Sequence, residues 1–498
     1  MIKIIIPILF TAFLLSEVFG QVHFRKREFR GAWVATVANI DWPSSKLSSS
    51  EDQMNELKGN FDKLKKAGIN SVIFQVRTEC DALYSSNLEP WSYWLTGEQG
   101  NAPQPFFDPL QLAVEEAHKR GMELHAWFNP YRAVKDIDDY SVSEFHVTNV
   151  HPDWILTFDK YKMLNPGVPE VKEYIVSIIE DVIRNYDVDG IHFDDYFYPY
   201  SPKVSNEDSV TFISYGNGFA NIDDWRRYNI NSMVAAVHEK INQIKPHLKF
   251  GISPFGIVEN KYAGTNGFNS YSNLYCDPLT WIKDKTVDYV TPQIYWEIGH
   301  KLADYALLLP WWSSVVEDRH LYTGQYSSRF TSTKYTGNKS AMGDQLRLNR
   351  EFSNVGGSIF FSAKSIINNY SGFTDTLVND FYKYPALTPL MNWKDHIQPY
   401  APKSFSVEKK EGYFQIKWLQ PDAAADGDTA KYFVIYMSTS NDDIDLDDPR
   451  NILTIVDGSV TELIHDCEYD NDEQITFSIS SLDKVQNESI ENPVVLIR

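Results

Sequence analysis

Strand-like and helix-like segments alternate between about residue 28 and residue 385, and this alternation constrains the fold more than any other feature of the chain. Parallel strands need a crossover helix between them, so the order predicts an α/β protein built on a (β/α)8 TIM barrel. The predicted strands are Phe29–Thr36, Ser71–Arg77, Met122–Asn129, Gly190–Tyr196, Phe250–Pro254, Tyr289–Glu297, Leu321–Gln325 and Gly357–Ser362. The predicted helices are 51–67, 109–120, 169–186, 223–243 and 342–352.

Some of the connections that follow the strands are unusually long. About 30 residues follow Arg77 and about 40 separate Asn129 from the helix near Glu170, whereas ordinary connections contain about four to six residues. Enzymes with this fold carry their sites on the loops at the C-terminal ends of the strands. The sequence therefore predicts a substrate site at that mouth of the barrel.

The pattern changes after the barrel, for which we predict the boundaries 25–390. A linker is expected at 391–402, and residues 403–498 then show short alternating runs in place of helices. This spacing predicts a small C-terminal β-sandwich domain. Its predicted strands are Phe414–Trp418, Tyr432–Met437, Asn451–Val456 and Thr476–Ser481.

The first 20 residues have the pattern of a signal peptide. Lys3 precedes a short apolar run from Ile4 to Leu15, and a cut is expected near Gln21. The apolar run is too short to span a membrane as a helix. We therefore expect an exported protein, periplasmic or extracellular, that does not span the membrane.

Charge and cysteine content exclude several classes of partner. A net charge of −21 argues against nucleic acid, because phosphate contacts need a basic surface. The three cysteines are too few for a disulfide framework, although Cys80 and Cys276 could pair. No Cys/His cluster and no glycine-rich dinucleotide turn are present, so we expect neither a metal nor a cofactor. The sequence does not indicate an oligomeric state.

The segment from Asp189 to Tyr198 begins as a buried strand and ends in acidic and aromatic residues. Ile191 and Phe193 alternate with His192 and Asp194, and Asp195 follows directly. Two adjacent carboxylates at the end of a buried strand need a functional reason, because burying charge is costly. Carboxylates among aromatic rings suggest chemistry on a sugar.

One polar face can be followed along most of the predicted strands, since side chains alternate between two faces. The opposite face is largely apolar, as at Val72, Phe74 and Val76, and can pack on helices. The polar face would point into the barrel and converge at its mouth. Its candidate members are Gln75, Arg77, His125, Trp127, Asn129, His192, Asp194, Tyr196, Gln293, Tyr295, Glu297 and Gln325.

Glycoside hydrolysis requires two carboxyl groups, one of which protonates the leaving oxygen while the other attacks or activates water. Asp194 ends the fourth predicted strand and Glu297 ends the sixth, so these two are the predicted catalytic pair. A structural ion pair with Arg77 is the alternative. By the same alternation, Asp195 lies on the opposite face of the strand from Asp194. It is either the true acid or a hydrogen-bond acceptor that supports Asp194.

The remaining candidates are predicted to bind substrate. Arg77 could hold a substrate carboxylate or lower the pKa of Asp194, and His125 and His192 could tune the acids. Asn129 could donate a hydrogen bond to a sugar hydroxyl. Trp127, Tyr295 and Trp296 are candidate sugar platforms, and Glu79, Asp81 and Glu89 are expected to be solvated.

Several motifs, occurring in order, resemble the glycosyl-hydrolase-like family 10, and the resemblance covers roughly residues 25–385. These motifs are Phe29-Arg30-Gly31-Ala32-Trp33-Val34, Asp41-Trp42-Pro43, Phe74-Gln75-Val76-Arg77, Trp127-Phe128-Asn129-Pro130, residues 189–199, Pro292-Gln293-Ile294-Tyr295-Trp296-Glu297 and Gly324-Gln325-Tyr326. The family implies an exported bacterial hydrolase with a TIM barrel. At least one similar member cleaves peptidoglycan glycan strands that lack stem peptides, so this resemblance makes peptidoglycan glycan the leading substrate.

Two further resemblances bear on mechanism and architecture. The fourth strand is similar to the chitinase pattern D-G-x-D-x-D-x-E, but Tyr196 stands where that pattern has its catalytic Glu. This departure argues against chemistry assisted by a substrate N-acetyl group. The C-terminal segment resembles a fibronectin type III module, with Trp418 as its core tryptophan.

Three hypotheses follow from these observations. The first is an exported glycoside hydrolase acting on a polysaccharide, and the second is a carbohydrate-binding barrel without turnover. The third, a metal-dependent hydrolase using His125, His192 and Asp194, is the weakest because no HxH or HExxH spacing is present.

Overall fold

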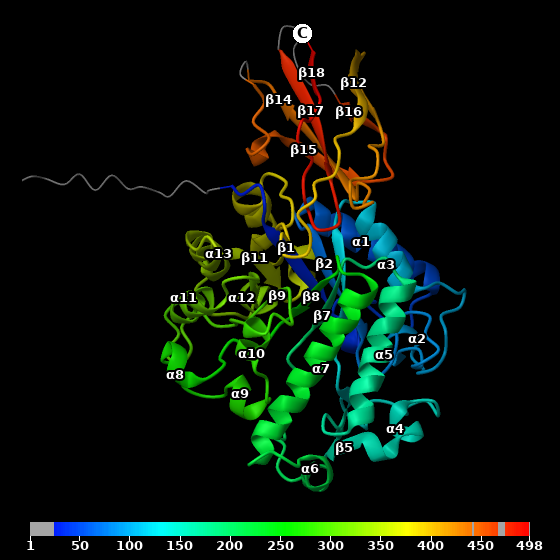
Figure 1. The fold of residues 1–498 in the computed structure, drawn as a ribbon, viewed down its shortest axis with the longest axis vertical. Helices are drawn as coiled ribbons and strands as arrows, with labels where there is room; N and C mark the ends of the chain where they lie inside the picture. The colour runs from blue at the N-terminus through cyan, green and yellow to red at the C-terminus, as the bar shows by residue number, and fades with distance from the viewer. Residues whose placement is uncertain (1–23, 441–442, 467–473, 498) are drawn as a thin grey trace, which may run out of the picture.

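The computed structural model describes residues 24–440, 443–466 and 474–497, so the predicted signal peptide and Cys467 lie outside the described residues. Eight parallel strands close into a barrel in the order β1-β11-β10-β9-β8-β7-β3-β2. Helices flank this barrel (Figure 1), in the arrangement of a TIM barrel. The strands are β1 Phe29–Val34, β2 Ser71–Arg77, β3 Glu123–Phe128, β7 Gly190–Phe193, β8 Lys249–Ile252, β9 Tyr289–Val290, β10 His320–Gln325 and β11 Val355–Phe360.

Several of the longer helices begin at a residue whose side chain caps them. The side chain of Ser49 accepts a hydrogen bond from the amide of Asp52, and that of Asp108 does the same for Gln111, ahead of a proline at the first helical position. The longer helices are α1 Ser50–Lys66, α3 Pro109–His118, α5 Pro169–Asn185, α7 Ile222–Ile244, α11 Tyr305–Val315 and α13 Ala341–Glu351. All but α11 were predicted, each within about two residues of the observed bounds.

Short helical segments lie mainly in the loops. They are α2 Tyr93–Thr96, α4 Val147–Val150, α6 Ser209–Tyr215, α8 Asn260–Ala263, α9 Ser270–Asn273, α10 Pro278–Lys283, α12 Ser327–Phe330, α14 Ala363–Ile367 and α15 Phe373–Thr376. Single turns of other helical types are η1 Val37–Asn39, η2 Pro152–Trp154, η3 Tyr370–Gly372, η4 Leu377–Phe381 and η5 Pro449–Asn451. In addition, β4 Arg132–Val134, β5 Ile155–Phe158 and β6 Tyr161–Leu164 form a small sheet in the long loop after β3.

Several barrel strands end earlier than the sequence pattern predicts, and β9 and β7 differ most. β9 ends at Val290, and beyond it Gln293 makes only isolated bridges to Phe255 and Gly324. Pro292 has no amide hydrogen to contribute to a ladder, which explains the early end of the strand. β7 ends at Phe193, so Asp194 is the first residue of the loop that follows.

The C-terminal module contains two antiparallel sheets that share one hydrophobic cluster. One sheet consists of β12 Lys403–Lys410, β13 Tyr413–Leu419 and β16 Glu462–Asp466, and the other of β14 Tyr432–Ser438, β15 Ile452–Asp457, β17 Ile475–Leu482 and β18 Val494–Ile497. Trp418 from the first sheet is buried with Phe433 and Phe477 from the second. The predicted pattern contained β13, β14, β15 and β17 but not the other three strands.

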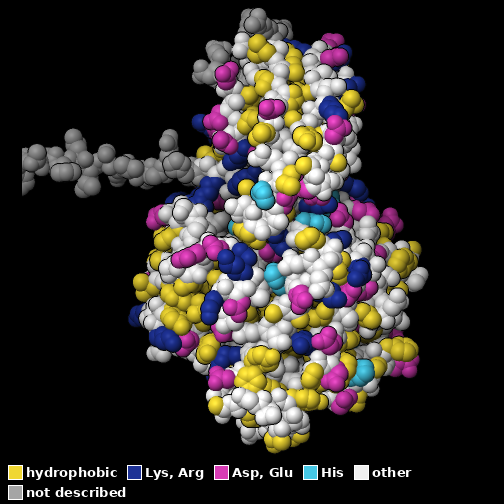
Figure 2. Space-filling view, viewed as in Figure 1, with side chains coloured by type: hydrophobic (Ala, Val, Ile, Leu, Met, Phe, Trp, Pro, Cys, Tyr) yellow, Lys and Arg dark blue, Asp and Glu magenta, His cyan; other side chains and the backbone are white. Residues whose placement is uncertain are grey.

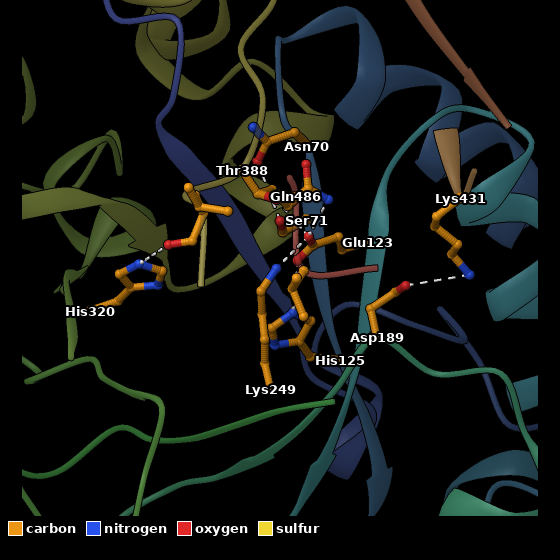
Figure 3. Close-up of polar contacts among 12 residues, drawn as sticks. Asn70, Ser71, Glu123, His125, Asp189, Lys249, His320, Thr388, Lys431 and Gln486 are labelled. Atoms are coloured by element: carbon orange, nitrogen blue, oxygen red, sulfur yellow. Dashed lines mark hydrogen bonds and ion pairs between the residues drawn. The ribbon is translucent and has the colours of Figure 1, made fainter. Parts of the chain in front are cut away.

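The module docks on the N-terminal ends of the barrel strands, away from the mouth at which the strands end (Figure 1). Gln486 of the module donates a hydrogen bond of 3.2 Å to Glu123 of β3. The Nζ atom of Lys431 lies 3.6 Å from Oδ1 of Asp189, and Figure 3 shows both pairs. Figure 2 shows basic, acidic and histidine side chains gathered along this junction.

Candidate active site

A cavity of about 240 Å3 opens at the C-terminal mouth of the barrel. It has room for about one sugar ring, and its walls are mainly aromatic. The rings come from several different strand ends, namely Trp33, Trp127, Tyr196, Tyr295, Tyr326 and Phe361. Its polar groups are few, as is usual for a small-molecule site. They are the side chains of Gln75, Arg132, Asp194, Ser253 and Gln293.

Asp194 is the acidic residue that lines this cavity, and three donors surround its carboxyl group. The side-chain amide of Asn129 and the indole Nε1 of Trp127, at 3.3 Å, donate to Oδ2, while the amide of Tyr196 donates to Oδ1 at 3.3 Å. Burial raises the pKa of Asp194 to about 6 against the opposing effect of Arg132 and these donors. Donors on a carboxylate favour its ionised form.

Asp195 is fully buried beside Asp194. The hydroxyl of Tyr200 donates a hydrogen bond to Oδ2 of Asp195, and Oδ1 has no hydrogen-bond partner in the described part of the chain. Burial, and then the charge of Asp194, raise the pKa of Asp195 to about 7. The two adjacent carboxyl groups therefore titrate close to neutrality, and ionisation of one disfavours ionisation of the other.

A network under the cavity fixes the orientation of Asn129. Oε1 of Gln75 accepts hydrogen bonds from the amides of Thr36, at 2.9 Å, and Val37, at 3.0 Å. The Nε2 atom of Gln75 therefore donates to Oδ1 of Asn129, at 2.6 Å. With its oxygen held in this way, Asn129 can only present its Nδ2 hydrogens to Asp194.

Glu297 lies outside this cavity. Its carboxylate lies beside Gly337 and Tyr335, and residues 297–302 line a separate surface hollow. The side-chain alternation of a strand does not continue to Glu297, because β9 ends at Val290. Trp296 and Gln325 also lie away from the cavity: Trp296 packs edge-on against Phe255, and Gln325 donates a hydrogen bond of 3.1 Å to Gln345.

Arg77 does not reach the cavity either, because the register of β2 against β3 shifts between Gln75 and Arg77. Its guanidinium forms an ion pair with Glu89 at 2.6 Å and donates to the carbonyl of Asn129 at 2.7 Å. Arg77 therefore holds the loops after β2 and β3 together.

The expectation that Glu79, Asp81 and Glu89 are solvated is wrong, because all three are buried. Oε2 of Glu79 accepts a hydrogen bond of 2.7 Å from the indole of Trp94, and Oδ1 of Asp81 caps the amide of Thr78 at 3.0 Å. These carboxylates order the long loop after β2. The possible pairing of Cys80 with Cys276 does not occur, since both thiols are free and buried.

His125 and His192 lie deeper, along the axis of the barrel. The Nδ1 atom of each ring is 2.9 Å from the hydroxyl of Tyr289, which stands between them. The structure therefore does not assemble His125, His192 and Asp194 into a metal site, and the described residues contain no other group of three or more His, Cys, Asp or Glu so placed.

Sequence reasoning identified six cavity residues and missed others. Gln75, Trp127, Asp194, Tyr196, Gln293 and Tyr295 line the cavity, and Asn129 contacts Asp194 from behind. Arg132, Ser253 and Phe361 were missed because each follows a strand end, where side-chain alternation no longer indicates direction. Tyr326 stands in the Gly324-Gln325-Tyr326 motif, which was a signal that could have found it.

Comparisons with known proteins identify the family. Residues 28–339 match the family model described as glycosyl hydrolase-like 10. The chain belongs to this family. It is 37% identical over 505 residues to glycosyl hydrolase YngK of Bacillus subtilis (strain 168), an alignment that covers 98% of this chain and 97% of that protein.

A second relative matches about two thirds of the chain. Glycosyl hydrolase DigH of Escherichia coli (strain K12) is 37% identical over 362 residues, which cover 67% of this chain and 82% of that protein. Among solved structures, the glycoside hydrolase domain of PgaB (BpsB) from Bordetella bronchiseptica superposes with a TM-score of 0.46 at 11% identity, covering 71% of this chain and 99% of that one. The family and its named members make the protein a glycoside hydrolase.

No helix among the described residues is long and apolar enough to cross a membrane.

Proposed function

We propose that this glycoside hydrolase is exported and cleaves the glycan strands of peptidoglycan with Asp194 and Asp195 as its paired carboxyl groups. The observation that carries the proposal is the pair itself, in which Asp194 lines a cavity with aromatic walls at the mouth of the barrel and Asp195 is buried directly beside it. The substrate follows from the motifs that resemble a family containing a hydrolase of peptide-free glycan strands. Asp195 takes the place of Glu297 as the partner of Asp194, because Asp195 is coupled to Asp194 by its charge, whereas Glu297 lines a separate hollow.

The environments of the two acids assign them different roles. Asp194 is surrounded by donors and lines the cavity, so its ionised form faces the sugar and stabilises the positive charge that develops at the anomeric carbon. Burial and the charge of Asp194 raise the pKa of Asp195 to about 7. Asp195 therefore retains a proton when Asp194 is ionised, and we assign it as the source of the proton that reaches the leaving glycosidic oxygen.

Turnover on purified glycan tests the assignment. Peptide-free strands and intact, peptide-bearing peptidoglycan are incubated with the protein, and released fragments are quantified by chromatography and mass spectrometry. We expect fragments from peptide-free strands, and a loss of about 100-fold or more in kcat for both Asp194→Asn and Asp195→Asn. Glu297→Gln should retain most of the activity. Full turnover in both Asp variants, or an equal loss in Glu297→Gln, would contradict the assignment.

We also propose that the C-terminal module is a fibronectin type III-like β-sandwich that supports the barrel from its base. The shared cluster of Trp418, Phe433 and Phe477 supports this architecture. Its position leaves the cavity uncovered. Export is tested separately: fractionation of the native host should place the mature protein outside the cytoplasm, with a new N-terminus near Gln21.

A further inference from the structure

Arg132 is the one basic side chain among the described residues that line the cavity. It begins strand β4, part of the small sheet inserted after β3, and it is 5% exposed. A buried guanidinium cannot lose its proton to escape the cost of burial, because its pKa is too high. Its charge therefore has to be balanced by a partner.

The other fully buried arginines each have a carboxylate partner. Arg30 pairs with Glu28 at 2.8 Å, Arg77 with Glu89 at 2.6 Å and Arg226 with Asp208 at 2.5 Å. Within residues 24–440, 443–466 and 474–497, no carboxylate lies within ion-pair distance of Arg132. Burial opposes the charge of Arg132, and Asp194 and Glu79 raise its pKa by attraction, but neither carboxylate pairs with the guanidinium directly. A buried charge without a direct partner is costly in a folded protein, so an arginine of this kind at the wall of a cavity indicates a binding site for an anionic group.

The hydrogen bonds of Arg132 show which part of the guanidinium is free. Nε donates to the carbonyl of Thr78 at 2.8 Å, and Nη2 donates one hydrogen to Oδ1 of Asn129 at 2.9 Å. The group lies over the ring of Tyr196, with its carbon 5.2 Å from the ring centre. Nη1 makes no hydrogen bond with the described residues, so the fork between Nη1 and Nη2 remains available, and this fork fits the two oxygens of a carboxylate.

We propose that Arg132 binds a carboxylate on the sugar in the cavity, so that the enzyme selects an acidic sugar residue. This inference deepens the proposed function and rests on it for the identity of the sugar. In peptidoglycan the lactyl group of N-acetylmuramic acid carries a free carboxylate only where the stem peptide has been removed. With the peptide in place, the same group is an uncharged amide.

Arg132 is therefore a specificity-determining residue. The charge favours the free acid over the amide, because the amide would leave the buried guanidinium unpaired. This effect favours peptide-free strands.

The test isolates the contribution of the carboxylate to substrate recognition. Peptide-free strands are compared with the same strands after conversion of the lactyl carboxylates to primary amides, which removes the charge and adds no bulk. Wild-type protein should cleave the acidic strands at least tenfold better in kcat/KM. In Arg132→Gln this preference should fall to about one, through loss of activity on the acidic strands, and Arg132→Lys should retain part of it. Arg329→Gln, an exposed arginine on α12, should behave as wild type.

Three results would overturn the proposal. One is a wild-type enzyme that does not distinguish acid from amide, a measurement that does not depend on whether a variant folds. Another is an equal loss on both substrates in Arg132→Gln, which would mean that Arg132 acts by tuning Asp194 or by ordering β4. The third is a preference that survives unchanged in Arg132→Gln.

A measurement of binding tests the role of Arg132 independently of the proposed catalytic function. Trp33 and Trp127 line the cavity, so their fluorescence reports occupancy without turnover. N-acetylmuramic acid should bind at least tenfold more tightly than its methyl ester in wild type and equally in Arg132→Gln. If peptidoglycan is not cleaved but this difference is present, the proposed function fails and the role of Arg132 stands. If strands are cleaved but the difference is absent, the reverse holds.

Discussion

At the scale of single residues, the catalytic proposal rests on the difference between two adjacent acids. Asp194 has three donors and Asp195 has one tyrosine donor and an unpaired oxygen. Their sequence positions differ by one, so only the environment separates them. Environments that push the pKa values of neighbouring acids apart are a common way to assign one acid and one base.

This difference predicts a narrow pH optimum. Asp194 must be ionised, so kcat/KM should fall as the pH drops below about 6, and Asp195 must be protonated, so activity should fall above about 7. The pH dependence of kcat/KM on peptide-free strands, measured from pH 4 to 9, should therefore be bell-shaped. A profile that is flat from pH 5 to 8 would contradict the assignment of roles.

The same shift predicts that Asp195 destabilises the folded protein at high pH. Its folded pKa of about 7 lies above the unfolded value of 3.8, so the cost is absent below the unfolded value and complete above the folded value. Asp195→Asn should raise the free energy of unfolding by up to about 4 kcal/mol at pH 8 and have little effect at pH 4. Urea denaturation at both pH values measures this difference, and an equal change at both would contradict it.

Residues at strand ends show what the sequence could and could not predict. Asp194 could be found because a buried strand leads directly into it. Arg132 could not be found from the sequence, because the direction of its side chain depends on the small sheet β4-β6-β5. That sheet pairs residues up to about 30 positions apart. Glu297 was predicted in error because Pro292 ends the hydrogen bonding of β9. The side-chain alternation of the strand therefore does not extend as far as Glu297.

At the scale of elements, helices were easier to predict than strand ends. Caps such as Ser49 and Asp108 act within three residues, so they can be read locally. A strand in a barrel ends where its two neighbours stop pairing, which is not a local property. The barrel topology was nevertheless predictable, because the alternation of strands and helices leaves few arrangements.

The strands also build a polarised column of hydrogen bonds along the barrel axis. The indole of Trp33 can only donate, and it lies 3.1 Å from Nε2 of His192. Burial lowers the pKa of His192 well below its usual value, so the ring is neutral and its proton is on Nδ1. Nδ1 then donates to Tyr289, whose hydroxyl donates to Nδ1 of His125. The Nε2 hydrogen of His125 is left to donate to Glu123 at 3.2 Å.

Tyr289→Phe should break this column at its centre. Two buried imidazole nitrogens would lose their partner, at a cost of about 1–3 kcal/mol each in the free energy of unfolding. Tyr84→Phe is the matched control, because its buried hydroxyl has no hydrogen-bond partner within the described residues. Urea denaturation of both variants measures the difference, and nitrogen NMR of the histidines should show the two tautomers in wild type. Equal stability of the two variants would mean that the column contributes nothing.

At the scale of the whole molecule, the two ends of the barrel carry separate tasks. The cavity lies at the C-terminal mouth, and the C-terminal module covers the opposite end (Figure 1). The contacts at the base are polar and buried: Glu123 accepts hydrogen bonds from Gln486 and from Thr388, at 2.6 Å, and pairs with Lys249 (Figure 3). The module should therefore affect stability more than turnover.

Lys431 gives the sharpest test of this separation. Its Nζ lies 2.9 Å from Asp187 and 3.6 Å from Asp189, and only 13% of its side chain is exposed. Burial opposes ionisation of Asp189, but His118 and then Lys431 hold its pKa far below the usual range. A carboxyl with a lowered pKa stabilises the fold above its unfolded value, and this contribution is lost as the pH falls through the folded value.

Lys431→Met should remove that support and leave Asp189 dependent on His118. We expect the free energy of unfolding at pH 7 to fall by about 2–3 kcal/mol, with kcat and KM on peptide-free strands unchanged. Lys403→Met, which removes an exposed pair with Asp422 at 2.6 Å, should cost less than about 1 kcal/mol. Urea denaturation and steady-state kinetics of the two variants decide the matter. A fall in kcat for Lys431→Met would show that the base of the barrel is coupled to its mouth. The physical connection would then be the column of hydrogen bonds that runs along the barrel axis from Glu123 to Ser253 at the cavity wall, through His125, Tyr289 and His192.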